Sequence, residues 1–269
     1  MPTFFSIINS PLLSYKYIKA KNNSNKYLLI LHGLLGCADN WLPQGKIFSE
    51  YFNVLIPDLR NHGNSFHNDS MSYEDMANDI LQLNNYLHLG QISIIGHSMG
   101  GKLAMLIALN NPNIIDKLIV IDIAPDKYIT DANYKLLNIL ASIPMNEFKS
   151  RDEIRNFIKR KVPNFREVDL VMKNIKLNNQ RKYEWKINLD ALIKNINILA
   201  DFPTLHKKFI KPVLFLRGEK SNHILPQHYD KIYNYFPNTY IQTVSNAGHW
   251  VQVDNTDEFI KYSLEYLKV

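Results

Sequence analysis

The sequence predicts an α/β protein whose sheet is mainly parallel and carries helices on both faces. Apolar runs of strand length at residues 27–32, 54–56, 92–95 and 117–123 alternate with segments of helical spacing, and this alternation is typical of parallel sheets. The 269 residues are 46% hydrophobic, which is enough to bury one large core. Functional sites of such sheets form at the carboxyl ends of the strands.

Each element follows from its local pattern. Residues 15–19 predict a strand that pairs antiparallel with one at residues 4–8, and Pro57 ends the strand at 54–56. Ser72 begins a capping box that precedes a helix with apolar residues at helical spacing. The C-terminal part alternates again, with strands at 212–216 and 240–244 and helices at 229–236 and 257–267.

Residues 126–209 interrupt this alternation with charged amphipathic helical patterns. We therefore expect a core formed by residues 1–125 and 210–269, with residues 126–209 inserted as a helical cap. Residues 147–190 hold 12 lysines and arginines but only 7 acidic residues, so most of the net charge of +6 lies there. This basicity indicates a solvated helical surface or a rim that attracts an anionic substrate carrier. No nucleic-acid-binding motif accompanies it.

Composition also narrows the compartment and the chemistry. No segment approaches the roughly 20 apolar residues of a membrane span, and the N-terminus lacks the basic region of a secretory signal. The one cysteine, Cys37, excludes an intrachain disulfide. We therefore expect a cytoplasmic protein without a membrane partner. The spacing of the histidines matches no metal motif, so we expect no metal site.

The most informative motif is Gly96-His97-Ser98-Met99-Gly100, between an apolar strand and a helix. A serine in such a sharp turn has strained backbone geometry and an exposed hydroxyl, and the flanking glycines avoid collisions. The positive end of the helix dipole points toward charge that develops there. Ser98 is therefore the candidate nucleophile.

A serine nucleophile needs a base, and the base needs an acid to orient it. His249 is the best-placed base, because it follows the last predicted strand in a glycine-containing loop at the same edge of the sheet. Asp122, near the end of the strand after the Ser98 helix, is the favoured acid. Glu219 is the fallback acid, since the turn at residues 217–223, a usual place for the acid, contains no aspartate.

The tetrahedral intermediate of acyl transfer also needs two N–H donors that converge on its oxyanion. The N–H of Met99, directly after the nucleophile, is one candidate. The turn at residues 32–36 follows a strand, and we expect it to supply the other donor from the N–H of Leu34.

Together, the motifs at residues 32–36, 57–65, 96–102 and 121–125 resemble the α/β-hydrolase superfamily, and within it the YbfF-type esterases. The resemblance implies an eight-stranded sheet with a helical cap, and a Ser/His/Asp triad whose acid follows the sixth strand. It also implies that the protein hydrolyses short acyl esters, and its implied substrates include acyl-CoA thioesters.

The resulting hypothesis is a cofactor-free serine hydrolase of short acyl esters that works through an acyl-enzyme. Its partners would be small acyl esters, or thioesters carried by coenzyme A or an acyl-carrier protein. Two alternatives stay open. One is a lyase or carbon–carbon bond hydrolase with the same triad, and the other is a ligand receptor on a hydrolase scaffold.

Overall fold

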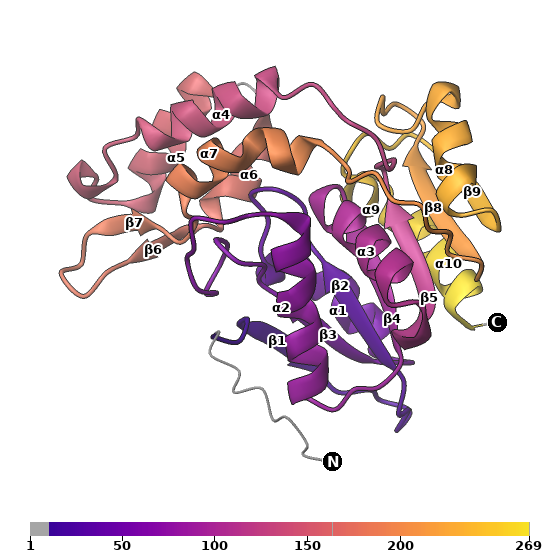
Figure 1. Cartoon of the computed structure of the whole chain (residues 1–269). Helices are drawn as coiled ribbons and strands as arrows, with labels where there is room; N and C mark the ends of the chain where they lie inside the picture. The colour runs from indigo at the N-terminus through magenta and orange to yellow at the C-terminus, as the bar shows by residue number, and fades with distance from the viewer. Residues whose placement is uncertain (1–10, 163, 269) are drawn as a thin grey trace, which may run out of the picture.

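The computed structural model describes residues 11–162 and 164–268 and contains a seven-stranded, mostly parallel sheet (Figure 1). The strand order is β1-β3-β2-β4-β5-β8-β9, and only β1 runs antiparallel, against β3. The strands are β1 (Tyr15–Ile18), β2 (Tyr27–Leu31), β3 (Asn53–Pro57), β4 (Ile92–His97), β5 (Ile115–Ile121), β8 (Val213–Gly218) and β9 (Thr239–Val244). The predicted fold class is confirmed. The predicted strand at residues 4–8 lies outside the described residues.

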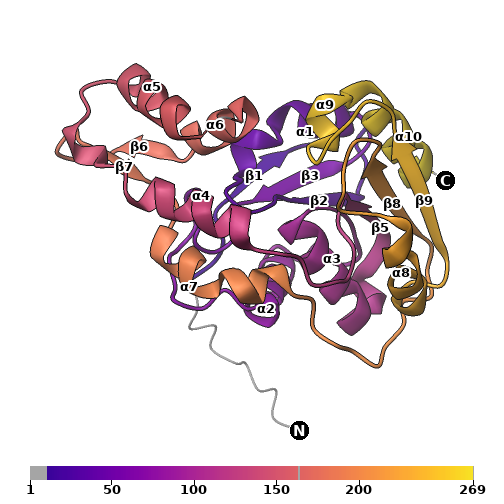
Figure 2. The ribbon, with the colours of Figure 1, turned by 90° about the horizontal axis from the view of Figure 1, so that it is seen from above.

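Helices cover both faces of the sheet (Figure 2). Alternate residues of β2 point to opposite faces of the sheet. Leu29 belongs to the apolar cluster on one face, here called the first face, and Leu28 belongs to the apolar cluster on the second face. The first face carries α2 (Tyr73–Tyr86), α3 (Met99–Asn110) and α8 (Tyr229–Tyr235), and the second carries α1 (Leu42–Phe48), α9 (Val251–Asp254) and α10 (Thr256–Lys268).

Ser72 caps α2 as predicted, since its hydroxyl accepts a hydrogen bond from the N–H of Asp75. The reciprocal bond of a capping box is not formed among the described residues, because the Asp75 carboxylate accepts from the hydroxyls of Ser70 and Ser72 instead of the backbone N–H of Ser72. The sequence analysis did not predict α1 or α9. Both are short, at 7 and 4 residues, so they present too few turns for a helical period to be visible.

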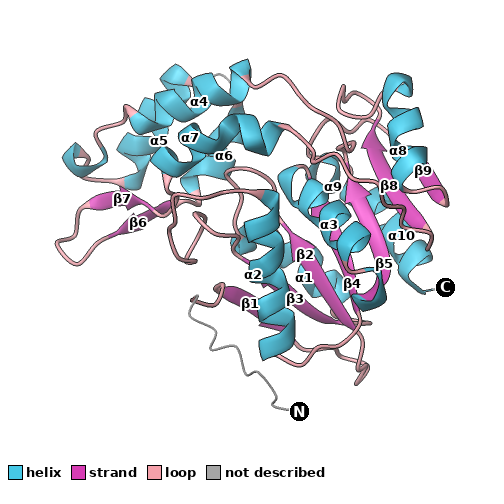
Figure 3. Ribbon diagram, viewed as in Figure 1, coloured by secondary structure: helices cyan, strands magenta, loops and turns pink. Residues whose placement is uncertain are grey.

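Residues 126–209, here called the inserted segment, leave the sheet after β5 and return to it at β8 (Figure 3). The predicted helices are joined by a small hairpin that the sequence analysis did not predict, because each of its strands has only 3 residues. The elements are α4 (Asp131–Ala141), α5 (Arg151–Lys161), α6 (Phe165–Met172), β6 (Ile175–Leu177), β7 (Tyr183–Trp185) and α7 (Leu189–Ala200).

Buried polar groups attach the end of the inserted segment to the core. The Lys102 ammonium on α3 donates to the backbone carbonyl oxygens of Ala200 and, at 3.0 Å, of Asp201. The Tyr73 hydroxyl on α2 donates to the carbonyl oxygen of Leu199 at 2.7 Å. A cation suits this position, because the carbonyl groups at the C-terminus of α7 carry partial negative charge.

Within the part of the chain that the structure describes, every helix is too short or too polar to cross a lipid bilayer.

Candidate active site

Ser98 occupies a strained turn between β4 and α3. Its backbone lies at φ 53° and ψ −118°, a conformation that costs a non-glycine residue about 1–3 kcal/mol. Its N–H donates to the carbonyl oxygen of Ile121 at 3.1 Å. The flanking glycines are required by space: a Cβ on Gly96 would lie 2.3 Å from the carbonyl oxygen of Gly100, and one on Gly100 would lie 2.4 Å from that of Leu31.

Asp122 is fully buried directly after β5. Its Oδ2 lies 2.9 Å from Nδ1 of His249 and accepts a hydrogen bond from the Ser221 hydroxyl, while its Oδ1 accepts one from the N–H of Gly218 at 3.0 Å. Burial raises the pKa of this carboxyl group, and the hydrogen bonds from Ser221 and Gly218 oppose that rise.

His249 lies in the loop after β9. Its backbone carbonyl oxygen accepts a hydrogen bond from Nε2 of His97 at 2.9 Å, which attaches this loop to the end of β4. Burial lowers the pKa of the His249 imidazole to about 4, so the ring is neutral at neutral pH. Because its Nδ1 faces a carboxylate oxygen, Nδ1 carries the proton and Nε2 is left as the basic nitrogen.

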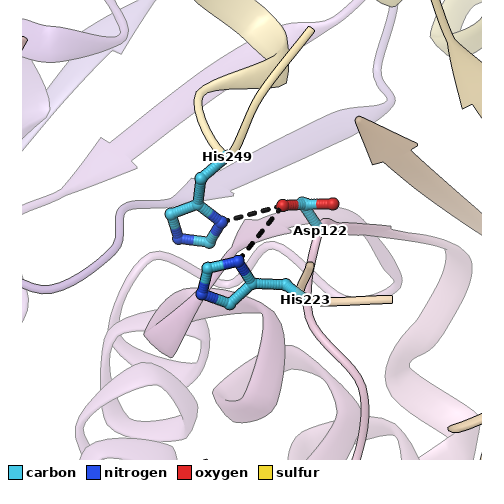
Figure 4. Close-up of side chains that lie close together, drawn as sticks. All are labelled: Asp122, His223 and His249. Atoms are coloured by element: carbon cyan, nitrogen blue, oxygen red, sulfur yellow. Dashed lines mark hydrogen bonds and ion pairs between the residues drawn. The ribbon is translucent and has the colours of Figure 1, made fainter. Parts of the chain in front are cut away.

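A second imidazole, His223, lies against the first (Figure 4). The ring centroids of His223 and His249 are 3.7 Å apart and their planes differ by 20°. Nδ1 of His223 lies 3.7 Å from Oδ2 of Asp122, so both rings turn Nδ1 toward the same oxygen atom. His223 is not among the site residues that the sequence predicted. Its place in the turn after β8 could have indicated it, but that turn was considered only as a source of the acid.

The backbone after β2 lies against Ser98. A Cβ built on Gly33 would be 3.2 Å from Cβ of Ser98, so the next residue, Leu34, is close to the serine turn. Among the described residues, neither the N–H of Leu34 nor that of Met99 donates to a backbone acceptor. Both sequence-predicted oxyanion donors are therefore available to a ligand.

The turn that contains Leu34 is held from two sides. Leu35 has a positive φ of 61°, its N–H donates to Nε2 of His62 at 3.2 Å, and its carbonyl oxygen accepts from the Asn174 side chain at 2.7 Å. Burial lowers the pKa of His62 to about 3, so its Nε2 remains an acceptor at neutral pH. Asn174 belongs to the inserted segment, which thereby contacts the turn directly.

Two cavities meet at Leu34. One, of about 450 Å³ including its open mouth, is lined by Ser98 and Met99 together with Lys102, Tyr128, His223 and apolar residues. The other, of about 730 Å³, lies on the other side of the turn. Its lining includes Trp41 and Trp250 from the core and Arg166, Asp169 and Lys173 from the inserted segment. Leu34 lines both cavities, whereas Ser98 lines only the smaller one.

Glu219 takes a different position from Asp122. Its side chain is exposed and accepts a hydrogen bond from the N–H of Asn246 at 2.7 Å. The structure therefore brings Asp122, and not Glu219, to Nδ1 of His249.

Among the described residues, Asp122, His223 and His249 are the set whose ligand atoms, all within 4.8 Å of one another, could hold a metal ion. No spacing motif in the sequence indicates this cluster, because its members are far apart along the chain. Its geometry is accounted for without an ion, since Asp122 and His249 share a proton and the two rings stack.

Comparisons with known proteins agree with this architecture. Residues 26–147 match the family described as alpha/beta hydrolase fold. The chain is 33% identical to a putative esterase/lipase from Haemophilus influenzae, over 97% of this chain and 90% of the relative. It is 25% identical to esterase YbfF from Escherichia coli, over 91% of this chain and 94% of the relative. A solved structure, a marine microorganism esterase, has a TM-score of 0.92 and 38% identity, covering 96% of this chain and 100% of that one.

The chain belongs to the α/β-hydrolase fold family. Within that family it is an esterase/lipase-type enzyme, which places it in the class of carboxylic ester hydrolases. The resemblance to YbfF-type esterases that the motifs indicated is confirmed.

Proposed function

We propose that the chain is a serine esterase in which Ser98 is the nucleophile, His249 the general base and Asp122 the residue that orients the base. The observation that carries this proposal is the 2.9 Å hydrogen bond between Oδ2 of Asp122 and Nδ1 of His249. It joins residues 127 positions apart, at the same edge of the sheet as Ser98. A buried carboxylate bonded to a neutral imidazole fixes the tautomer that general-base catalysis needs.

In this mechanism Nε2 of His249 takes the proton as Oγ of Ser98 attacks the acyl carbonyl carbon. The N–H groups of Leu34 and Met99 stabilise the oxyanion, and each such donor contributes about 2.7–4 kcal/mol to lowering the barrier. The intermediate then expels the alcohol or thiol, which receives the proton from His249. Water, activated by the same imidazole, hydrolyses the acyl-enzyme in the second half of the reaction.

Ser98→Ala tests the proposal. We expect its rate on p-nitrophenyl acetate and butyrate to fall by about 10³-fold or more, with correct folding shown by circular dichroism. Mass spectrometry of the quenched wild type should show an acyl group on Ser98, which a lyase acting through proton transfer alone would not form. Full turnover by Ser98→Ala would refute the role of Ser98.

We also propose that residues 126–209 act as a cap domain over a core of residues 1–125 and 210–269. Support comes from the bonds that Lys102 and Leu35 make to this segment and from its residues in the lining of both cavities. A cap in this position limits the acyl group to the smaller cavity and favours short acyl chains.

The larger cavity supports a finer proposal, that acyl thioesters of coenzyme A or an acyl-carrier protein are also substrates. Lys173 and Arg166 line this cavity, and both belong to the basic part of the inserted segment. Arg166 is paired with Asp254 at 2.7 Å, whereas the Lys173 ammonium donates to the backbone carbonyl oxygen of Asp39 at 3.3 Å. Lys173 is therefore the better placed of the two to attract a phosphate-bearing leaving group.

A further inference from the structure

The stacked imidazole His223 has no part in the mechanism derived above, yet it lies at its centre. It lines the cavity that contains Ser98, whereas Asp122 behind it is fully buried. The His223 ring lies against the His249 imidazole and turns its Nδ1 toward Asp122 (Figure 4). It therefore connects the cavity wall with the Asp122–His249 pair.

We propose that His223 is a positioning residue, whose ring fixes the plane of the His249 imidazole and keeps water from the hydrogen bond between His249 and Asp122. The inference rests on the proposed role of His249 as the base. In this role His223 transfers no proton, because it acts on His249 only through the contact between the faces of the two rings.

His223 is itself held from several directions. The Tyr128 ring stacks near it, with centroids 5.5 Å apart and planes 27° apart, and the Tyr128 hydroxyl donates to the carbonyl oxygen of His223. Oγ of Ser221 lies 3.2 Å from Nδ1 of His223 and also 3.2 Å from its backbone nitrogen. The backbone contacts fix the position of His223, and its ring cannot turn away from His249 without losing the stack on Tyr128 and the contact of Nδ1 with Ser221.

The stack suits the reaction only while His223 is neutral. A neutral aromatic face favours the imidazolium that forms on His249 during attack, whereas a second positive charge would oppose it. A charged His223 would also compete with His249 for Oδ2 of Asp122. Burial and the neighbouring His249 lower the pKa of His223 to about 4, so it is neutral at neutral pH.

The charged and titratable groups that face His223 come from several elements. Asp122 favours protonation of His223, whereas Lys102 and the protonated forms of His249 and His228 oppose it. The groups around it are Asp122, His249, His97, Lys102, Tyr128 and His228.

Three substitutions separate the ring from its polar atoms. His223→Phe keeps the ring, His223→Asn keeps a polar atom near Asp122, and His223→Ala keeps neither. We expect His223→Phe to retain kcat within about threefold, and both other variants to lose about tenfold in kcat with little change in KM, as follows from a displaced base.

The pH dependence provides a second readout. Burial is what lowers the pKa of His249, so opening the cavity wall moves that pKa back toward the ordinary value of 6.5. Between about pH 5.5 and 8 we expect kcat/KM of the wild type and of His223→Phe to stay flat. In His223→Ala it should fall as the pH drops below 6.5. The low-field NMR signal of the proton between Asp122 and His249 should persist in His223→Phe and broaden in His223→Ala.

The outcomes distinguish this inference from the proposed function. Wild-type kcat and a flat profile in His223→Ala would overturn the inference, and so would an active His223→Asn beside an inactive, folded His223→Phe. His249→Ala and Ser98→Ala, assayed in parallel, test the triad itself. If these two are inactive while His223→Ala equals the wild type, only the positioning role fails.

Discussion

Acidification should destabilise this protein steeply, because three buried histidines beneath the site are folded in their neutral form. Nε2 of His32 accepts from the N–H of Leu59 at 3.0 Å, and Nε2 of His62 accepts from that of Leu35. His97 contacts the carbonyl oxygen of His249. Burial is the main cause that lowers their pKa values, to about 4 for His32 and about 3 for His62 and His97.

The sign and size of the effect follow from proton linkage. An unfolded histidine titrates near 6.5 and the folded ones titrate lower, so the unfolded state binds more protons throughout the interval between these values. The free energy of unfolding therefore keeps its full value above pH 6.5 and decreases as the pH falls toward the pKa values of the folded histidines. At about pH 5.5 each of the three unfolded rings binds roughly 0.9 proton and the folded rings bind almost none, which corresponds to about 4 kcal/mol per pH unit. His223 and His249, whose pKa values burial also lowers to about 4, act in the same direction and bring the slope to about 6 kcal/mol per pH unit. A typical domain has only about 5–15 kcal/mol to lose.

Guanidinium denaturation at several pH values between about 7.5 and 5 measures this slope directly. His62→Gln removes one of these five titrating rings and keeps an acceptor for Leu35, so its slope should be about one fifth smaller than that of the wild type. His206→Gln, at an exposed position, is the control and should match the wild type. A free energy of unfolding that stays constant over this pH range, or an unchanged slope in His62→Gln, would show that these histidines do not fold in their neutral form.

Three further predictions concern activity. Asp122→Asn should lower kcat by about 10³–10⁴-fold while Glu219→Gln stays close to wild type, and comparable losses in both would contradict the assignment of the acid. Lys173→Glu and added salt should each raise KM for acyl-CoA but not for p-nitrophenyl acetate. Lys159→Glu on α5 is the control. Equal effects on the KM of both substrates would count against recognition of the carrier. Lys102→Met should cost about 1–3 kcal/mol of unfolding free energy and raise KM for esters, and wild-type values in both measurements would show that its two carbonyl contacts are dispensable.

The sequence predicted those parts of the site whose geometry is local. Gly96 and Gly100 mark a turn that only glycine permits on either side of Ser98, so the motif and its flanking elements were sufficient. The order of the strands then predicted which loops share an edge with it. For this reason the sequence alone predicts that Asp122, after β5, lies near a base that follows β9.

What could not be predicted depends on contacts between distant segments. The stack of His223 on His249 requires two loops to meet at a particular height, and no local pattern encodes that. The hairpin β6–β7 has strands too short for an alternating pattern, and its turn is fixed by the Asn178 side chain, which accepts from the backbone N–H groups of Gln180 and Lys182. Such side-chain bonds appear only once the backbone is placed.

Of the eight non-glycine residues with positive φ among the described residues, three follow neighbouring strands at the site. Leu35, Ser98 and Asp122 have φ values of 61°, 53° and 49°, and they follow β2, β4 and β5, which are neighbours in the sheet. Each such residue costs of order 1–3 kcal/mol and persists only where its surroundings determine it fully. Here the N–H of each is fixed by a buried acceptor, namely His62, the carbonyl oxygen of Ile121 and that of Leu216. If the backbone of any one of these three residues relaxed, its side chain or turn would move away from the other two. We therefore attribute the backbone strain to the function of this edge of the sheet.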